Sequence, residues 1–99
     1  MNLAKVLGTV VATHKESSLK GLKFLLLGQV DQEGESTGTS LVAVDAVGAG
    51  EGEYVLYASG SSARMTEVSE NRPCDAVVMA IVDSWEIGGE RRYKKYEDD

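Results

Sequence analysis

Five short apolar runs, separated by polar or glycine-rich residues, restrict what this chain can fold into. Their β-branched residues and the turn signals between them predict strands. Helical periodicity is weak, and only residues 61–68 favour a helical turn, with Ser61 or Ser62 as its N-cap. The predicted strands lie at residues 4–13, 21–30, 41–48, 53–59 and 75–87.

This arrangement favours an all-β fold with one short helical turn, a small five-stranded β-barrel of the OB type rather than a sandwich. Residues 31–40 contain no apolar side chain and are expected to form an exposed loop. A length of 99 residues suits one domain. We place this domain at residues 1–89 and a charged C-terminal tail at residues 90–99.

The charge, the apolar runs and the cysteine content of the chain restrict its partners and the cellular compartment that we expect. A net charge of −6 argues against nucleic acid, whose binding rests on clustered lysine and arginine. The longest apolar run, Ala76–Val82, is too short to span a bilayer, and residues 1–13 lack the apolar core of a secretory signal. The single cysteine, Cys74, fits a reducing compartment. We therefore expect a cytoplasmic protein with no membrane partner.

No combination of residues predicts catalysis, a metal or a cofactor. His14 is the only histidine and lies in a polar stretch, where an exposed loop residue is expected. Cys74 begins an apolar strand and is interpreted as a structural thiol. The acidic residues near Asp31 lack the alternating ligands of a calcium loop.

The glycines at residues 48–52 raise the question of phosphate binding. Their spacing, Gly48-x-Gly50-x-Gly52, departs from the dinucleotide fingerprint, and a predicted strand follows instead of a helix. Glu51 and Glu53 would also repel a phosphate. These glycines are better interpreted as a tight strand-to-strand connection that uses positive φ angles or a bulge.

A second small-residue stretch, Gly60–Ala63, ends at Arg64. Its small side chains allow another backbone to approach, and the planar guanidinium of Arg64 suits a carboxylate. Asp45 and Asp83 are the candidate carboxylates, because each interrupts an otherwise apolar strand. An exposed turn with a solvated arginine is the alternative.

Three segments of the chain carry a resemblance to a known family. They read "GTVVATHKESSLKGLKFLLL", "DAVGAGEGEYVLYASGSSAR" and "AIVD". Their order and spacing resemble those of the bacterial microcompartment vertex proteins, the EutN/CcmL family. The resemblance covers roughly Leu3 to Gly89, nearly the whole chain.

The resemblance implies a structural shell protein and not an enzyme: an OB-like barrel that forms homopentamers at the corners of a shell whose facets are tiled by hexameric proteins. It places seven residues of the second quoted segment, here called the motif residues, at the subunit interface or five-fold axis, with Ser61 and Ser62 favoured at the central opening. Tyr93 and Tyr96 suggest that the tail contacts an adjacent subunit or a hexamer, unless it is disordered. An OB-like binding module for a small ligand or protein partner is the alternative function. The motif residues are Asp45, Gly48, Gly50, Gly60, Ser61, Ser62 and Arg64.

Overall fold

The computed structural model describes residues 1–95, whose regular secondary structure is almost entirely β-strand. Two short 3₁₀ helices, labelled η, lie between strands. The elements are β1 (Asn2–Val10), η1 (Ser17–Leu19), β2 (Phe24–Val30), β3 (Ser36–Asp45), β4 (Tyr54–Ser59), η2 (Gly60–Arg64), β5 (Ala76–Ile81), β6 (Ser84–Ile87) and β7 (Glu90–Lys94).

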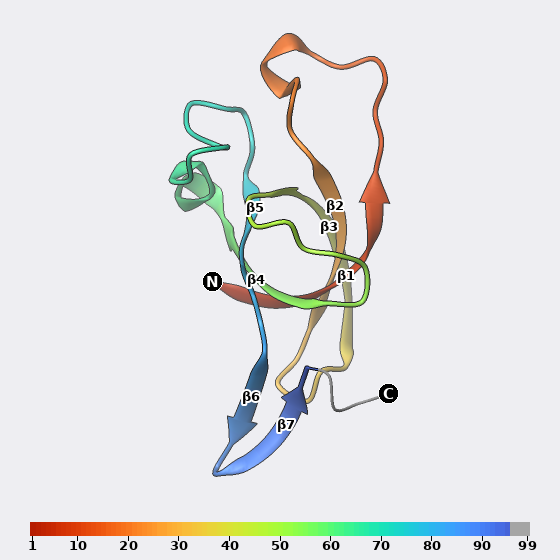
Figure 1. The fold of residues 1–99 in the computed structure, drawn as a ribbon, viewed down its shortest axis with the longest axis vertical. Coiled ribbons are helices and arrows are strands. Elements are labelled where there is room, and N and C mark those ends of the chain that lie inside the picture. The colour runs from red at the N-terminus through yellow and green to blue at the C-terminus, as the bar shows by residue number, and fades with distance from the viewer. Residues whose placement is uncertain (96–99) are drawn as a thin grey trace.

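The first five strands close into a barrel in the order β1-β2-β3-β5-β4 (Figure 1). Neighbouring strands are antiparallel except β3 and β5, which run parallel where Val44 pairs with Val77 and Asp45 with Val78. The predicted small five-stranded barrel is confirmed.

Alternating side chains fill the interior of the barrel. Leu25 and Leu27 of β2 are fully buried, as is Val55 of β4. Burying a side chain of this size contributes roughly 1.5–3 kcal/mol relative to leaving it exposed. The buried phenol of Tyr57 has a polar partner as well, because Gln29 Nε2 donates to its hydroxyl at 3.1 Å.

Strand β3 begins earlier than the sequence predicts. The predicted loop at residues 31–40 is wrong in its second half, because the β2–β3 ladder extends to the pair Val30 and Ser36. The true turn is residues 31–35, where Asp31 Oδ1 accepts from the amides of Glu33 and Glu35 at 2.8 and 3.0 Å. Local side-chain acceptors of this kind stabilise tight turns.

The last predicted strand, residues 75–87, is two strands. Only β5 joins the barrel, while β6 turns away and pairs with β7 in a separate two-stranded sheet. Figure 1 shows this hairpin extending from one end of the barrel. Residues 90–94 of the predicted tail therefore form a strand, and residues 96–99 lie outside the described residues. The division of the chain after Gly89 stays a prediction.

Candidate functional site

The connection between β3 and β4 is organised by the side chain of Asp45. Its Oδ1 accepts from the backbone amides of Val47 and Gly48 at 3.0 Å each, and from that of Ala49 at 3.3 Å. Its Oδ2 lies 3.7 Å from the ammonium of Lys23. Only 2% of the Asp45 side chain is exposed, so these partners supply what water would otherwise supply to the carboxylate.

The same connection crosses the barrel, as Figure 1 shows between β3 and β4. Ala49 is 1% exposed and belongs to the barrel core, while Gly48 and Gly50 on either side of it are exposed. Positive φ angles of 78° at Gly48 and 87° at Gly52 let the chain turn sharply before and after Ala49. The predicted tight connection with positive φ angles is confirmed.

Glu53 closes this connection at its other end. Its Oε1 accepts from the amide of Gly50 at 2.5 Å, and its Oε2 pairs with the ammonium of Lys95. The Lys95 hydrogen bond, helped by the Gly50 amide, lowers the pKa of Glu53 below its ordinary value of 4.5. Lys95 follows β7, so this pair joins the C-terminal hairpin to the motif connection.

The second motif segment forms η2. The prediction of Ser61 or Ser62 as its N-cap is wrong, because Ser59 occupies the N-cap position and makes no side-chain capping hydrogen bond. Instead, Ser62 Oγ donates to the carbonyl oxygen of Ser59 at 2.8 Å. The amide of Gly60, whose φ is 67°, donates to the carbonyl oxygen of Asp75 at 2.8 Å. Ser61 and Ser62 remain exposed.

Arg64 lies at the end of η2 with its side chain exposed. Within residues 1–95 the guanidinium makes no ion pair or hydrogen bond. Pairing with Asp45 or Asp83 is therefore absent within the described part of one chain. The exposed arginine of this chain matches the alternative of a solvated turn. A partner in a neighbouring subunit, which the family resemblance implies, stays a prediction.

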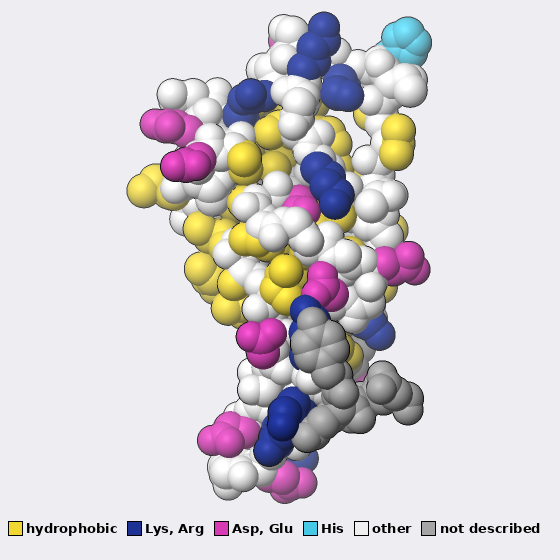
Figure 2. Space-filling view, viewed as in Figure 1, with side chains coloured by type: hydrophobic (Ala, Val, Ile, Leu, Met, Phe, Trp, Pro, Cys, Tyr) yellow, Lys and Arg dark blue, Asp and Glu magenta, His cyan; other side chains and the backbone are white. Residues whose placement is uncertain are grey.

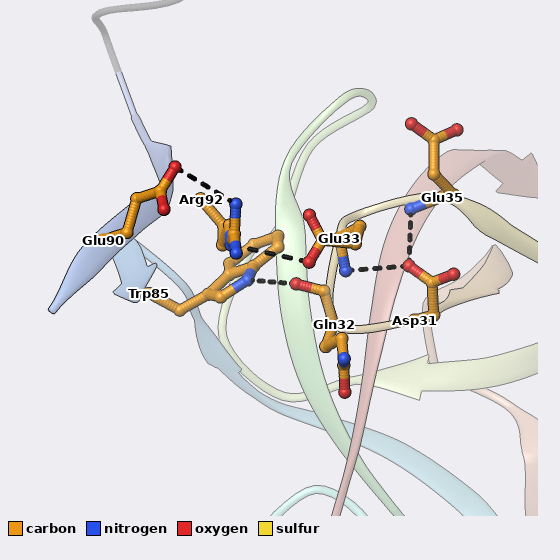
Figure 3. Close-up of polar contacts among 7 residues, drawn as sticks. All are labelled: Asp31, Gln32, Glu33, Glu35, Trp85, Glu90 and Arg92. Atoms are coloured by element: carbon orange, nitrogen blue, oxygen red, sulfur yellow. Dashed lines mark hydrogen bonds and ion pairs between the residues drawn. The ribbon is translucent and has the colours of Figure 1, made fainter. Parts of the chain in front are cut away.

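Sequence reasoning missed an aromatic cluster that joins the hairpin to the barrel. Trp85 of β6 stacks on Tyr93 of β7 with ring centroids 5.1 Å apart, and both rings contact Tyr54 of β4. Trp85 Nε1 donates to the carbonyl oxygen of Gln32 at 2.8 Å (Figure 3). The sequence carried one signal, because each strand within residues 84–94 contains an aromatic residue, Trp85 or Tyr93. The two rings together form an apolar surface that packs against Tyr54.

A charged contact lies beside the aromatic cluster. Arg92 Nε is 3.5 Å from a carboxylate oxygen of Glu33, in the β2–β3 turn, and its Nη1 is 3.3 Å from Glu90 (Figure 3). These pairs are partly exposed, so each stabilises by at most about 1 kcal/mol. The pair with Glu33 joins β7 to the β2–β3 turn, whereas the pair with Glu90 lies within β7.

The residues considered for chemistry have different environments. His14 is exposed in the loop after β1. Cys74 is 8% exposed and packs with Ala58 and Val77, the buried environment that the sequence interpretation expects of a structural thiol. Within residues 1–95, no group of three or more histidine, cysteine or acidic side chains is placed to hold a metal ion. None of the described helices is long and apolar enough to cross a membrane.

Comparison with known proteins identifies similar chains. A family model described as "Ethanolamine utilisation protein EutN/carboxysome" matches residues 1–83. The chain is 45% identical to the carboxysome shell vertex protein CcmL of Gloeobacter violaceus, covering 96% of this chain and 95% of that protein. It is 42% identical to the microcompartment shell vertex protein EutN of Escherichia coli K12, covering 96% and 100%.

Solved structures agree with these relatives. The structure of Gloeobacter violaceus CcmL matches with a TM-score of 0.92 at 45% identity, covering 96% of this chain and 98% of that one. The GrpN pentameric microcompartment shell protein of Rhodospirillum rubrum matches with a TM-score of 0.79 at 44% identity, covering 88% and 98%.

Proposed function

The chain belongs to the EutN/CcmL family, and we propose from that premise that it is a structural vertex protein of a bacterial microcompartment shell. Five copies form a ring that occupies a corner of the shell. The observation that carries this function is the near-complete match to shell vertex proteins in both sequence and barrel fold. A solved relative at 44% identity is described as pentameric.

The geometry of closed shells explains why such a subunit is needed. A flat sheet of six-fold tiles does not close, and about twelve five-fold positions introduce the required curvature. Hexameric shell proteins are therefore the partners that we propose for the outside of the ring. A small rigid barrel suits this role, because its surface is fixed by a closed set of hydrogen-bonded strands.

The exposed motif residues are our candidates for the inside of the ring. Gly48 and Gly50 lie on the connection that crosses the barrel, and Gly60 begins the short helix η2. Ser61 and Ser62 present hydroxyl groups that would suit the lining of a central opening. Asp45 differs from these residues, because its buried carboxylate holds the connection in its own chain. We propose that it supports the contact indirectly.

We propose no catalytic role. The relatives are named as shell vertex proteins, and the side chains of Asp45 and Ser62 bond backbone groups of their own turns. Native mass spectrometry of the purified protein tests the proposed ring. We expect a dominant species at five times the chain mass of 10.6 kDa. A monomer that fails to join shells when co-expressed with hexameric shell proteins would overturn the proposal.

A further inference from the structure

The strands of the C-terminal hairpin contain no buried residue. Every residue of β6 and β7 is exposed or half-buried, and none belongs to either core cluster. Figure 2 shows the same contrast: hydrophobic side chains gather over the barrel, whereas charged side chains of both signs lie at the end that carries the hairpin. Elements with few buried apolar contacts open at a lower cost in free energy than the core. The hairpin is therefore expected to open before the barrel does.

Three residues at the end of the chain converge on one place in the barrel. The rings of Trp85 and Tyr93 contact Tyr54, and the ammonium of Lys95 pairs with Glu53. Glu53 and Tyr54 are neighbours in sequence, and they mark the point where the β3–β4 connection enters β4. The hairpin thus grips the barrel at the end of this connection.

Glu53 carries that grip into the connection itself. Residues 50–53 form a tight turn, in which the amide of Glu53 donates to the carbonyl oxygen of Gly50 at 3.1 Å. One oxygen of the Glu53 carboxylate accepts from the amide of Gly50, and the other faces Lys95. Only 23% of the Glu53 side chain and 18% of the Lys95 side chain are exposed, so solvent screens this pair less than an open surface pair. Lys95 therefore holds the carboxylate in the orientation that reaches Gly50.

The two halves of the connection are held in different ways. In the first half, Asp45 accepts from the amides of residues 47–49. Neither this carboxylate nor its partner Lys23 belongs to the hairpin. In the second half, Gly50 is held by Glu53, whose carboxylate is held in turn from the hairpin. Movement of the hairpin is therefore expected to affect only the second half.

We infer that the C-terminal hairpin is a clamp that keeps residues 50–53 ordered through Lys95 and Glu53. While the hairpin is docked, Glu53 is fixed and the amide of Gly50 is bonded. When the hairpin opens, Lys95 leaves and the amide is released. Lys95 is thus a positioning residue, because it acts on Gly50 through Glu53. The consequence for assembly rests on the proposed function: Gly50 is a candidate for the inside of the ring, so moving the hairpin would change a surface used there.

Lys95→Met tests the clamp, because it removes the ammonium and leaves Glu53 in place. Amide hydrogen exchange, followed by NMR, is expected to become several-fold faster at Gly50. Residues 47–49 are expected to keep their wild-type rates, since Asp45 still holds them. Lys95→Arg retains a cation and is expected to keep most of the slow exchange at Gly50. Lys20→Met, which removes an exposed lysine at the opposite end of the molecule, is the control and is expected to change neither rate (Figure 1).

Trp85→Ala tests the clamp from the far side of the hairpin. Its one polar side-chain atom bonds the carbonyl oxygen of Gln32, so Trp85 makes no hydrogen bond to the connection. Releasing the hairpin there is nevertheless expected to speed up exchange at Gly50. All variants are compared in one assembly state, established by native mass spectra, and their folding is checked by circular dichroism.

Two results would overturn the clamp. An unchanged rate at Gly50 in Lys95→Met would show that the turn of residues 50–53 holds itself. A faster rate in Lys95→Met but not in Trp85→Ala would reduce the clamp to a local ion pair that does not follow the hairpin. The exchange test needs no ring, so its failure leaves the vertex function intact. A wild-type chain that forms no ring, alone or with shell partners, overturns the vertex function and leaves the clamp standing.

Discussion

The indole Nε1 of Trp85 donates to the backbone carbonyl oxygen of Gln32 at 2.8 Å, across 53 residues of sequence. This bond ties β6 to the turn between β2 and β3. The ring of Trp85 also contacts Tyr54 and Tyr93, so one side chain joins the hairpin to the barrel by a polar and an apolar contact. The hairpin therefore depends on Trp85 for its position.

Trp85→Ala is expected to release the hairpin without unfolding the barrel. The change removes two aromatic contacts, each contributing about 0.5–1.5 kcal/mol beyond buried area, and one hydrogen bond. Amide hydrogen exchange is expected to speed up in residues 84–94 and to stay slow in Phe24–Val30. Ile87→Ala, in the same hairpin but outside the aromatic cluster, is the control and is expected to change exchange much less. Equal exchange in both variants would contradict this role of Trp85.

Asp45→Ala is expected to destabilise the protein far more than Asp45→Asn. Alanine leaves three backbone amides without their acceptor, at a cost of about 2–4 kcal/mol in the free energy of unfolding. Asparagine keeps an oxygen acceptor and loses only the attraction to Lys23. That attraction contributes less than about 1 kcal/mol, because the lysine is mostly exposed. Urea unfolding of both variants measures the difference, and equal losses would show that charge, not the acceptor, is the dominant contribution.

The pair of Glu53 and Lys95 predicts a loss of stability in acid. The folded-state pKa of Glu53 lies below its ordinary value of 4.5, because the Lys95 hydrogen bond and the Gly50 amide favour the carboxylate. A lowered pKa contributes stability above the unfolded-state value, and this contribution disappears as the pH falls through the folded-state value. We expect Glu53→Gln to flatten the pH dependence of the unfolding free energy below about pH 5.

Glu16 gives the comparison for this pH effect. A hydrogen bond from the Ser18 side chain also lowers its pKa, but Glu16 is fully exposed. Glu16→Gln is therefore expected to change the acid dependence less than Glu53→Gln. A wild-type slope that persists in Glu53→Gln would assign the acid sensitivity to other carboxylates.

Arg72→Gln is expected to loosen the loop that contains η1. Arg72 Nη1 donates to the carbonyl oxygens of Ser18 and Lys20 at 2.9 Å each, and so holds this loop against the segment before β5. Without the guanidinium, trypsin is expected to cleave after Lys20 several-fold faster under native conditions. Arg91→Gln, in β7 at the opposite end of the molecule, is the control (Figure 1). Unchanged cleavage at Lys20 would contradict the role of Arg72.

The barrel was predictable because its core strands alternate or remain apolar over several residues. Residues 36–40 of β3 were not, since both of their faces are exposed and no hydrophobic pattern marks them as a strand. The hairpin was missed for another reason. Its position depends on contacts with Gln32 and Glu33, which lie far away in the sequence and carry no local signal.

The candidate site was predictable in kind but not in detail. An acid within an apolar strand predicted a partner for Asp45, and partners are present. They are Lys23 and the amides of its own connection, not Arg64. Backbone amides are present at every residue, so a sequence gives no indication of which ones converge on a carboxylate. The positive φ angle at Gly48 turns the connection as its amides converge on the carboxylate.

Arg64 is the residue that we expect to contribute most to the ring among the motif positions. Its guanidinium is exposed and has no partner within the described part of its own chain, and arginine is enriched at the energetic centres of interfaces. Arg64→Ala is expected to weaken the ring by about 2 kcal/mol or more per contact, which native mass spectra at decreasing concentration would detect. Arg64→Lys keeps the charge but loses the planar donor fork, so an intermediate effect is expected if the partner is a carboxylate. Thermal unfolding of the dissociated subunit is expected to be the same in all three proteins, because the Arg64 guanidinium makes no hydrogen bond or ion pair among residues 1–95 of its own chain. An unchanged ring in Arg64→Ala would remove Arg64 from the interface and leave its exposed guanidinium as a solvated side chain.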